Sequence, residues 1–395
     1  MNLAEFYALL SPQGQDVLIA ALEIQPREKD FLTHFQNLSR RFPREIARPA
    51  VETAILRLEA ASKFPQAQKM YFTREALEQA SSVEVSSYRA RRYEGFEQIA
   101  DLGCSIGGDT LSLAALAPTL GFDLDPLRLA MARQNLQALG FPAHFVQTDL
   151  VSSFPCIKHP ATALFFDPAR RANGRRIASV RKYIPPLQIV TEWQTDFPSI
   201  GVKISPGVDL AELADFEAEI EFISLRGELK EAVLWFGLLK TGERRATVLP
   251  GPHTLVEANP LMQPAAVISE PKSYFYEPDP AIIRAGMVRA LGNQLEAAQV
   301  DEEIAYLTAD QKVETPFARV WAVADWFPFQ LKNLRAYLRE RKINRVTVKK
   351  RGSPITPEDL IQALRLPKDG TDERVVFLTQ LSGNPIVVIC HPEEK

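Results

Sequence analysis

The sequence predicts an α/β fold: a largely parallel, Rossmann-like sheet, preceded by a small helical domain and followed by a second, α+β domain. Three observations support this prediction. Residues 1 to about 65 show helical spacing of apolar residues and no strand pattern. From about residue 98, short apolar segments alternate with helical ones, which is typical of βαβ units. The chain ends in the order strand, helix, strand, strand.

A chain of 395 residues accommodates two or three domains. We expect a helical domain over 1–66, a sheet domain over 67–250, a Pro- and Gly-rich crossing over 251–275, and an α+β domain over 276–395. In the helical domain, Ser11-Pro12 and Phe42-Pro43 mark breaks between helices.

The sheet domain contains a succession of short apolar segments. Strands are expected at 98–102, 119–123, 144–147, 161–166, 187–191, 201–204, 218–224 and 231–238. A helix is expected from Pro126 to Leu139, ended by Gly140. The last two strands are expected to form a hairpin around residues 225–230.

The third domain is expected to begin with helices over 280–291 and 328–342. A βαββ unit follows, with a strand at 345–349, a helix at 357–366 and strands at 374–380 and 386–391.

The composition excludes several classes of protein. The chain has 46 Lys and Arg against 49 Asp and Glu, a formal net charge of −3, which excludes a globally basic nucleic-acid binder. Cys104, Cys156 and Cys390 lie far apart and the chain has five histidines, so neither disulfides nor a metal site is expected; a reducing, cytoplasmic setting fits. No apolar run approaches the ~18–20 residues that span a bilayer, and the N-terminus lacks the pattern of a secretion signal.

The most specific motif is a glycine-rich turn after the first strand, Asp101-Leu102-Gly103-Cys104-Ser105-Ile106-Gly107-Gly108-Asp109-Thr110. Its spacing, G-x-x-x-G-G, differs from the G-x-G-x-x-G of dinucleotide enzymes, and no Lys-Ser/Thr pair follows as in a P-loop. Asp101 repels a phosphate and can attract a cation. Both phosphate-binding interpretations are therefore disfavoured.

Two further acids follow the next two strands. Asp123 lies 20 residues after Gly103, where a carboxylate accepts both ribose hydroxyls of a nucleoside cofactor. Asp149 can accept a hydrogen bond from an adenine amino group while the Leu150 N–H donates to the ring; the alternative is that Asp149 caps a helix. Three strand-end acids without a phosphate-binding device predict a pocket for a cationic nucleoside, and S-adenosylmethionine is such a ligand.

The glycine-rich turn resembles motif I of class I S-adenosylmethionine-dependent methyltransferases, in the D-x-x-C-G-x-G-G-N-T form of trimethylguanosine synthase. Ser105 replaces a usual Gly and Asp109 a usual Asn. The segment Tyr71–Glu75 resembles the entry segment of that enzyme, and the likeness covers about residues 68–240. It implies S-adenosylmethionine as the cofactor, and cofactor contacts from Phe72, Thr73, Asp101, Gly103, Cys104, Gly107, Gly108, Asp123, Leu124, Asp149, Leu150 and Asp167.

The fourth strand leads into Asp167-Pro168-Ala169-Arg170-Arg171. In the methyltransferase fold this strand end faces the reactive methyl group, and many amino-methyltransferases carry Asp/Asn-Pro-Pro-aromatic there. Asp167 and Pro168 match that pattern, whereas Ala169 and Arg170 replace the second proline and the aromatic. We expect Asp167, Pro168 and Arg170 to form the catalytic segment, with Arg170 stacking on a base or clamping a phosphate.

A covalent route to carbon methylation needs a cysteine beside the acceptor. Nothing in the sequence places Cys156 there, and Cys104 is expected to be a packed residue.

Basic residues are concentrated in two places. Six lie between Arg170 and Lys182 with no acid, and nine lie between Lys332 and Arg351 with Glu340 as the one acid. Such clusters can neutralise phosphates, or they can be solvated helix faces. The Val348–Gly352 turn and the βαββ unit around it resemble the THUMP-like domain that follows such methyltransferase domains in some bacterial proteins. We therefore expect RNA contacts from Arg170, Arg171, Arg175, Arg176, Lys349, Lys350 and Arg351.

Together these features predict an S-adenosylmethionine-dependent methyltransferase whose favoured acceptor is RNA. Two alternatives stay open. The acceptor can be a protein side chain or a small molecule, or the chain can be a catalytically silent RNA-binding protein that retains the fold. The aromatic position taken by Arg170 favours the silent alternative. No membrane or metal partner is expected, and the sequence does not indicate an oligomeric state.

Overall fold

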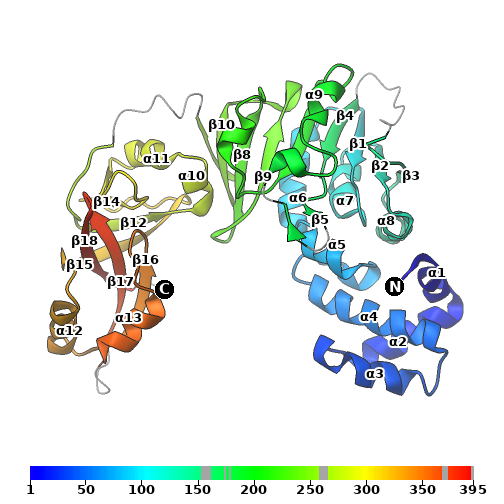
Figure 1. Cartoon of the computed structure of the whole chain (residues 1–395), viewed down its shortest axis with the longest axis horizontal. Helices are drawn as coiled ribbons and strands as arrows, with labels where there is room; N and C mark the ends of the chain where they lie inside the picture. Colours follow the sequence, from blue (N-terminus) through cyan, green and yellow to red (C-terminus); the bar gives the residue numbers. More distant parts are fainter. Residues whose placement is uncertain (153–161, 173–174, 178, 258–265, 367–371, 393–395) are drawn as a thin grey trace. The chain divides into compact units, whose positions relative to one another are not determined.

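The computed structural model describes residues 1–152, 162–172, 175–177, 179–257, 266–366 and 372–392 (Figure 1). Contacts divide the chain into two units. Residues 1–220 and 230–241 form the first, and residues 221–229 and 242–395 form the second. The division crosses the hairpin of β8 (Glu219–Leu225) and β9 (Glu228–Trp235), whose turn residues Arg226 and Gly227 have positive φ angles. The predicted boundaries at residues 66, 250 and 275 stay predictions.

The first unit begins with helices, as predicted: α1 (Leu3–Leu10), α2 (Pro12–Glu23), α3 (Phe31–Leu38) and α4 (Arg44–Ala60). Asn2 and Glu5 form a capping box at the start of α1, and Ser11 caps α2 with Pro12 in its first turn. These helices share one buried apolar core with α8 (Pro126–Leu139), to which Phe6, Leu56 and Leu136 belong.

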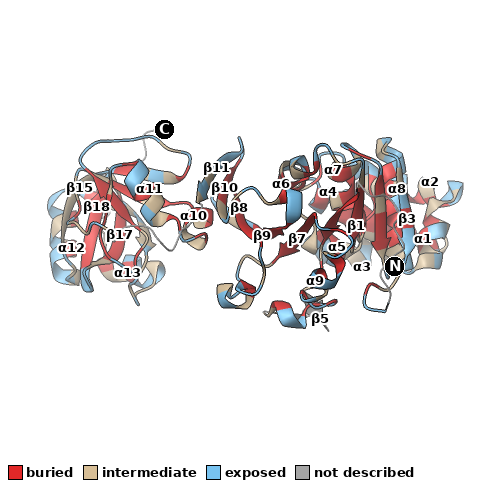
Figure 2. Cartoon of the chain, turned by 90° about the horizontal axis from the view of Figure 1, so that it is seen from above, coloured by how far each residue is buried: buried red, intermediate tan, exposed pale blue. Residues whose placement is uncertain are grey.

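The sheet of the first unit has the strand order β9-β7-β4-β1-β2-β3. The strands β1 to β4 and β7 run parallel, and β9 is antiparallel to β7. Figure 2 shows β1 and β7 as largely buried strands. The bounds are β1 (Gln98–Leu102), β2 (Thr119–Asp123), β3 (Ala143–Gln147), β4 (Thr162–Phe166) and β7 (Ile200–Ile204). This arrangement confirms the predicted fold class.

The order of the strands determines where a ligand can bind. The chain runs from β1 outward to β3 and then returns to β4 on the other side of β1. In such sheets a crevice opens at the carboxyl ends of the strands where the order reverses. The remaining helices of this unit are α5 (Arg74–Gln79), α6 (Val83–Ala90), α7 (Gly108–Ala114) and α9 (Ile189–Trp193), and a small ladder joins β5 (Arg171–Ala172) to β6 (Arg175–Arg176).

Two predicted elements were wrong. The strand expected at 187–191 is replaced by α9, because Val190, Trp193 and Phe197 are buried at helical rather than alternating spacing. The single helix expected over 280–291 is two helices, α10 (Pro280–Arg284) and α11 (Val288–Gln294). Gly286 lies between them with φ 72°, and this left-handed conformation ends α10.

The second unit contains an antiparallel pair, β10 (Arg244–Leu249) and β11 (His253–Glu257), and a seven-stranded sheet among its described residues. That sheet has the order β13-β14-β12-β15-β18-β17-β16. Its bounds are β12 (Tyr274–Pro278), β13 (Ala298–Gln299), β14 (Leu307–Ala309), β15 (Ala318–Pro328), β16 (Ile343–Lys350), β17 (Asp372–Leu381) and β18 (Asn384–Cys390).

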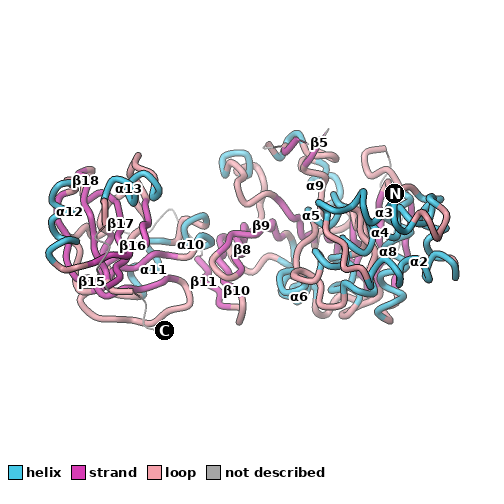
Figure 3. The backbone as a smooth tube through the Cα atoms, turned by 90° about the horizontal axis from the view of Figure 1, so that it is seen from below, coloured by secondary structure: helices cyan, strands magenta, loops and turns pink. Residues whose placement is uncertain are grey.

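The predicted βαββ unit is present: β16 runs parallel to β17, and β17 is antiparallel to β18. The helices α12 (Leu331–Glu340) and α13 (Pro357–Leu364) pack against the face of this part of the sheet to which Val376, Val387 and Ile389 belong. Figure 3 shows the two helices beside these strands. The strands between residues 298 and 328 were not predicted.

Candidate active site

A cavity of about 370 Å³ lies at the carboxyl ends of β1 to β4. This volume is in the range of small-molecule sites. Ten predicted site residues line it: Gly103, Cys104, Gly108, Asp123, Leu124, Asp149, Leu150, Asp167, Pro168 and Arg170. The strand-end residues therefore converge, as the parallel sheet requires.

The glycine-rich turn wraps closely against the ends of neighbouring strands. The Gly103 and Cys104 N–H groups donate to the Phe122 carbonyl at 2.8 and 3.0 Å. Gly103 has φ 84°, and a Cβ there would lie 2.6 Å from the Asp167 carbonyl oxygen. Any side chain at Gly103 would thus push the turn away from the segment after β4.

Asp123 is held in place at the end of β2. Its carboxylate accepts hydrogen bonds from the Ser105 and Asp125 N–H groups, both at 2.9 Å. Burial raises the pKa of Asp123, and these two N–H groups partly offset the effect. The side chain lines the cavity with its orientation fixed, which suits the predicted role of binding ribose hydroxyls.

We expect Asp123→Ala to weaken binding of S-adenosylhomocysteine by ~1–3 kcal/mol, because two ribose hydroxyls would lose their acceptor. Titration calorimetry measures this directly. Asp123→Asn, which keeps one acceptor oxygen, is expected to lose less. Full-strength binding by Asp123→Ala would contradict the ribose assignment.

Asp149 lies at the edge of the same cavity, but its carboxylate has local partners. The Val151 N–H donates to it at 2.9 Å and the Ser152 hydroxyl at 2.7 Å. These contacts lower the pKa of Asp149. Asp149 therefore stabilises the turn over residues 150–152, and no helix is described there for it to cap. Its contact with adenine stays a prediction.

Four other predicted cofactor residues lie outside the cavity lining. Phe72 is fully buried and packs against Phe64, with ring centroids 5.6 Å apart. Thr73 caps α5 by accepting the Ala76 N–H at 3.1 Å. Gly107 precedes α7 in the left-handed conformation, and Asp101 lies beneath the turn. Direct cofactor contacts from these four stay predictions.

Neither described cysteine has the environment of a nucleophile. Cys104 and Cys390 are buried free thiols, and burial raises the pKa of both well above the usual range. Cys156 lies outside the described residues.

Asp101 is completely buried. The Thr110 hydroxyl donates to its Oδ2 at 2.5 Å, and among the described residues its Oδ1 has no hydrogen-bond partner. Burial, reinforced by Asp109, raises the pKa of Asp101 to about 8. Its carboxyl group is therefore mostly protonated at neutral pH, and the negative charge near the cavity comes from other residues.

This burial makes stability depend on pH. Between the ordinary Asp value of ~4 and about 8, the folded state binds a proton at Asp101 that the unfolded state does not. The free energy of unfolding therefore falls as pH rises through this window, by up to ~1.4 kcal/mol per pH unit from this group. We expect Asp101→Asn to remove that slope and to gain stability relative to wild type towards pH ~8.

Urea unfolding at a series of pH values measures the slope. The exposed Asp16→Asn is the matched control and is expected to follow wild type. A wild-type slope retained in Asp101→Asn would show that another group binds the proton.

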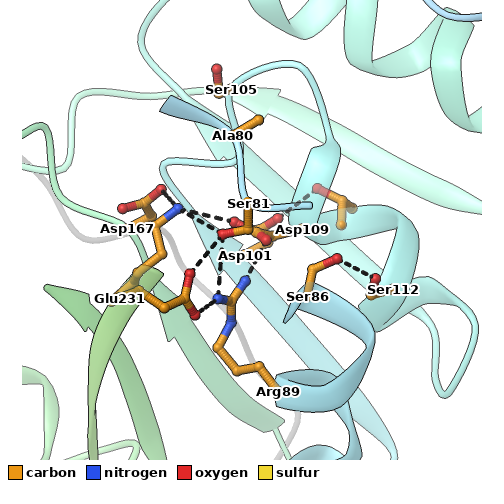
Figure 4. Close-up of polar contacts among 12 residues, drawn as sticks. Ala80, Ser81, Ser86, Arg89, Asp101, Ser105, Asp109, Ser112, Asp167 and Glu231 are labelled. Carbon is orange, nitrogen blue, oxygen red and sulfur yellow. Dashed lines mark hydrogen bonds and ion pairs between the residues drawn. The ribbon is translucent and has the colours of Figure 1, made fainter. Parts of the chain in front are cut away.

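A buried network of charges lies beside the cavity, because Asp109, Asp167 and Lys203 belong to the cavity lining. Figure 4 shows the polar contacts of this network. The Arg89 guanidinium on α6 pairs with Asp109 of α7 and Glu231 of β9. The Lys203 ammonium on β7 lies 2.5 Å from Asp167 Oδ2 and 3.4 Å from Asp109 Oδ2. The Ser81 hydroxyl donates to Glu231 at 2.8 Å. Five separate segments of the chain are thus held together at one point.

The charged groups of this network shift one another's pKa values. Burial alone would raise the pKa of Asp109, but Arg89 and Lys203 outweigh it and lower that pKa. Burial lowers the pKa of Lys203, but Asp167 and Asp109 outweigh it and raise that pKa. Asp109 is therefore a carboxylate and Lys203 an ammonium at neutral pH.

The segment after β4 closes the cavity. The Asp167 N–H donates to the Leu102 carbonyl at 3.0 Å, and Ala169 pairs with Ile184 through two backbone hydrogen bonds. Arg170 lines the cavity and is half-buried. Arg171, Arg175 and Arg176 follow in the β5–β6 ladder.

The sequence did not indicate Arg89, Lys203 and Glu231 as residues near the site, and it assigned no role to Asp109 of the glycine-rich turn. One signal was available for Lys203, because a lysine inside the otherwise apolar strand Ile200–Ile204 requires a buried anionic partner. Arg89 stands in an ordinary basic stretch, which gives no such signal.

The basic residues predicted to contact RNA in the second unit differ in their surroundings. Lys349 pairs with Glu277 and lies over the Trp321 ring, 4.9 Å from its centroid. Arg351 lies over the Tyr306 ring at 5.2 Å. Lys350 is exposed, and its Nζ donates to the Ser353 carbonyl at 3.3 Å. Other exposed basic side chains nearby are Lys332, Arg339, Arg341, Lys342 and Arg345.

Within the described residues, no three His, Cys, Asp or Glu side chains are grouped to hold a metal ion. The described helices include none with the length and apolar character required to cross a membrane.

The structure defines a Rossmann-like fold with a cavity at the carboxyl ends of its parallel strands. Similar proteins identify the family. An uncharacterized S-adenosylmethionine-dependent methyltransferase, found in two strains of Mycobacterium tuberculosis, is 35% identical over 363 residues, which covers 87% of this chain and 96% of the relative. A crystal structure of a candidate methyltransferase from Porphyromonas gingivalis covers 93% of this chain and 100% of its own, with a TM-score of 0.77 at 20% identity, and so shows the same fold.

Two matches concern parts of the chain. A family model described as THUMP domain-like matches residues 318–392, and a model for a domain of unknown function matches residues 2–60. Trimethylguanosine synthase of Schizosaccharomyces pombe is 32% identical over 65 residues, which is 16% of this chain and 27% of that enzyme.

The chain belongs to the family of S-adenosylmethionine-dependent methyltransferases. The cavity suits that cofactor, because its lining contains five aspartates and three basic residues and so favours a cation over a phosphate. When bound there, S-adenosylmethionine supplies an activated methyl group. The aspartates are Asp109, Asp123, Asp125, Asp149 and Asp167, and the basic residues are Arg128, Arg170 and Lys203.

Proposed function

We propose that this protein transfers the methyl group of S-adenosylmethionine to RNA, and that the segment Asp167–Arg170 forms the acceptor side of the site. Asp123 holds the ribose, and Asp149 with Leu150 contacts the adenine. Asp167 orients the acceptor or the cofactor's ammonium group, while Arg170 stacks on or clamps the acceptor nucleotide. Alignment of the acceptor atom, the methyl carbon and the sulfur supplies most of the rate acceleration, because the sulfonium group already provides an excellent leaving group.

The observation that carries the RNA assignment is the THUMP domain-like match, because it coincides with a dense group of basic residues. The likeness to an enzyme named for trimethylguanosine supports it. In this proposal the chain has the predicted domain boundaries at residues 66, 250 and 275, and the α+β domain over 276–395 binds RNA. The proposal also keeps a cytoplasmic location, which the free thiols of Cys104 and Cys390 suit.

The proposal is tested by incubating the protein with methyl-labelled S-adenosylmethionine and total cellular extract, then separating RNA, protein and small molecules. We expect label in RNA that ribonuclease releases. Label confined to protein or small molecules would identify the alternative acceptors, and no label despite cofactor binding would support a catalytically silent protein.

We expect Lys350→Ala to weaken RNA binding equally across sequences and to reduce the slope of log affinity against log salt by ~0.7–0.9, the effect of one phosphate contact. Lys349→Ala is the matched control, and its use departs from the expectation that Lys349 contacts RNA. Because the Lys349 charge is already balanced by Glu277, its salt slope is expected to stay close to that of wild type. Filter binding at several salt concentrations measures both, and equal slopes for all three proteins would mean that Lys350 is merely solvated.

A further inference from the structure

Lys203 is a buried cation of β7 that borders the cavity. Its side chain is 2% exposed, yet it is part of the cavity lining. The ammonium group lies 2.5 Å from Asp167, whose side chain is 21% exposed, and 3.4 Å from Asp109. Asp167 is therefore the member of this pair that faces a ligand, and Lys203 stands directly behind it.

The two nearby cations differ in what they touch. Arg89 pairs with Asp109 and Glu231 and is not part of the cavity lining. Lys203 contacts Asp167 and borders the cavity itself. Arg89 thus stabilises the packing of α6, α7 and β9, whereas the charge of Lys203 lies beside the space for a ligand.

We infer that Lys203 is a positioning residue that sets the charge at the methyl-transfer point by neutralising Asp167. This inference rests on the proposed placement of Asp167 beside the reacting atoms. Without Lys203, the site would present an unbalanced carboxylate to the positively charged sulfonium. With Lys203 present, the site favours S-adenosylmethionine over the uncharged S-adenosylhomocysteine less strongly.

The charge beside the sulfur affects the rate of methyl transfer. In the reaction, a lone pair of the acceptor forms a bond to the methyl carbon, and the carbon–sulfur bond breaks with its electron pair staying on sulfur. A proton of the acceptor group then passes to water. The positive charge on sulfur thus declines towards the transition state, so an unbalanced carboxylate would stabilise the ground state more and slow the transfer.

Binding of two ligands tests the inference without any acceptor. S-adenosylmethionine carries the sulfonium charge and S-adenosylhomocysteine does not, so the ratio of their dissociation constants reports the charge at this point. We expect Lys203→Met to shift the ratio about tenfold towards S-adenosylmethionine. Lys203→Arg, which keeps the charge, is expected to leave the ratio unchanged.

The pair can be separated from a merely structural role by a double-mutant cycle. Asp167→Asn is expected to shift the ratio in the opposite direction, and Lys203→Met/Asp167→Asn to return it close to the wild-type value. Lys69→Met, at an exposed lysine outside the cavity lining, is the control for loss of a lysine.

An unchanged ratio in a folded Lys203→Met variant would overturn the inference, as would an Asp167→Asn variant with the wild-type ratio. If Lys203→Met does not fold, Asp167→Asn carries the test alone. Since no RNA is present, a failure of RNA methylation would leave these results intact, and the inference can be distinguished from the assignment of RNA as acceptor.

Discussion

Replacement of Arg89 by methionine is expected to lower the free energy of unfolding by ~3–5 kcal/mol. The guanidinium is 3% exposed and pairs with both Asp109 and Glu231, so its loss leaves two buried carboxylates short of a cation. Methionine retains most of the side-chain volume, and the effect is therefore one of charge rather than of a cavity. Urea unfolding followed by circular dichroism measures the change in the transition of the first unit.

Arg74→Met is the matched control. Arg74 also bridges two acids, Glu28 and Glu59, but its side chain is 41% exposed. Exposed ion pairs contribute ~0–1 kcal/mol, so this variant is expected to stay close to wild type. Equal losses in the two variants would contradict the view that burial makes the Arg89 network important for stability.

Replacement of Arg170 by alanine is expected to lower RNA methylation ~10- to 100-fold at saturating cofactor, because the acceptor would lose its alignment. The affinity for S-adenosylhomocysteine is expected to change by less than ~2-fold, since the predicted cofactor contacts involve other residues. Initial rates with labelled cofactor and calorimetry on the same protein provide the two measurements.

Arg170→Lys distinguishes a planar guanidinium from a simple positive charge. Lysine lacks the flat, forked group that stacks on a base and clamps a phosphate, so we expect poor rescue. Loss of cofactor binding in Arg170→Ala, or unchanged turnover, would mean that this segment is structural and that the acceptor enters elsewhere.

The sequence predicted those parts of the site that depend on local pattern. The glycine-rich turn, Asp123 and the segment after Phe166 each follow a short apolar strand, and parallel strands bring their carboxyl ends to one edge. The helix Pro126–Leu139 was predicted to its last residue, because Asp125, Pro126 and Gly140 are local signals of its two ends.

The charge network was not predicted, because its members come from distant parts of the chain. Arg89 and Glu231 are 142 positions apart, and Lys203 and Asp109 are 94 apart. A pairing of this kind is determined by the packing of α6, α7, β7 and β9 together. The error at residues 187–191 has another cause: a short apolar run fits both a strand and a single helical turn, and neighbouring residues decide between them.

A crystal structure with S-adenosylhomocysteine shows directly whether the cofactor binds in this cavity with its sulfur towards the segment after β4. We expect the ribose hydroxyls to bind the Asp123 carboxylate, the adenine to lie beside Asp149 and Leu150, and the sulfur to point towards Asp167 and Arg170. A ligand bound elsewhere, or one in this cavity with its sulfur pointing away from Asp167, would contradict this expectation.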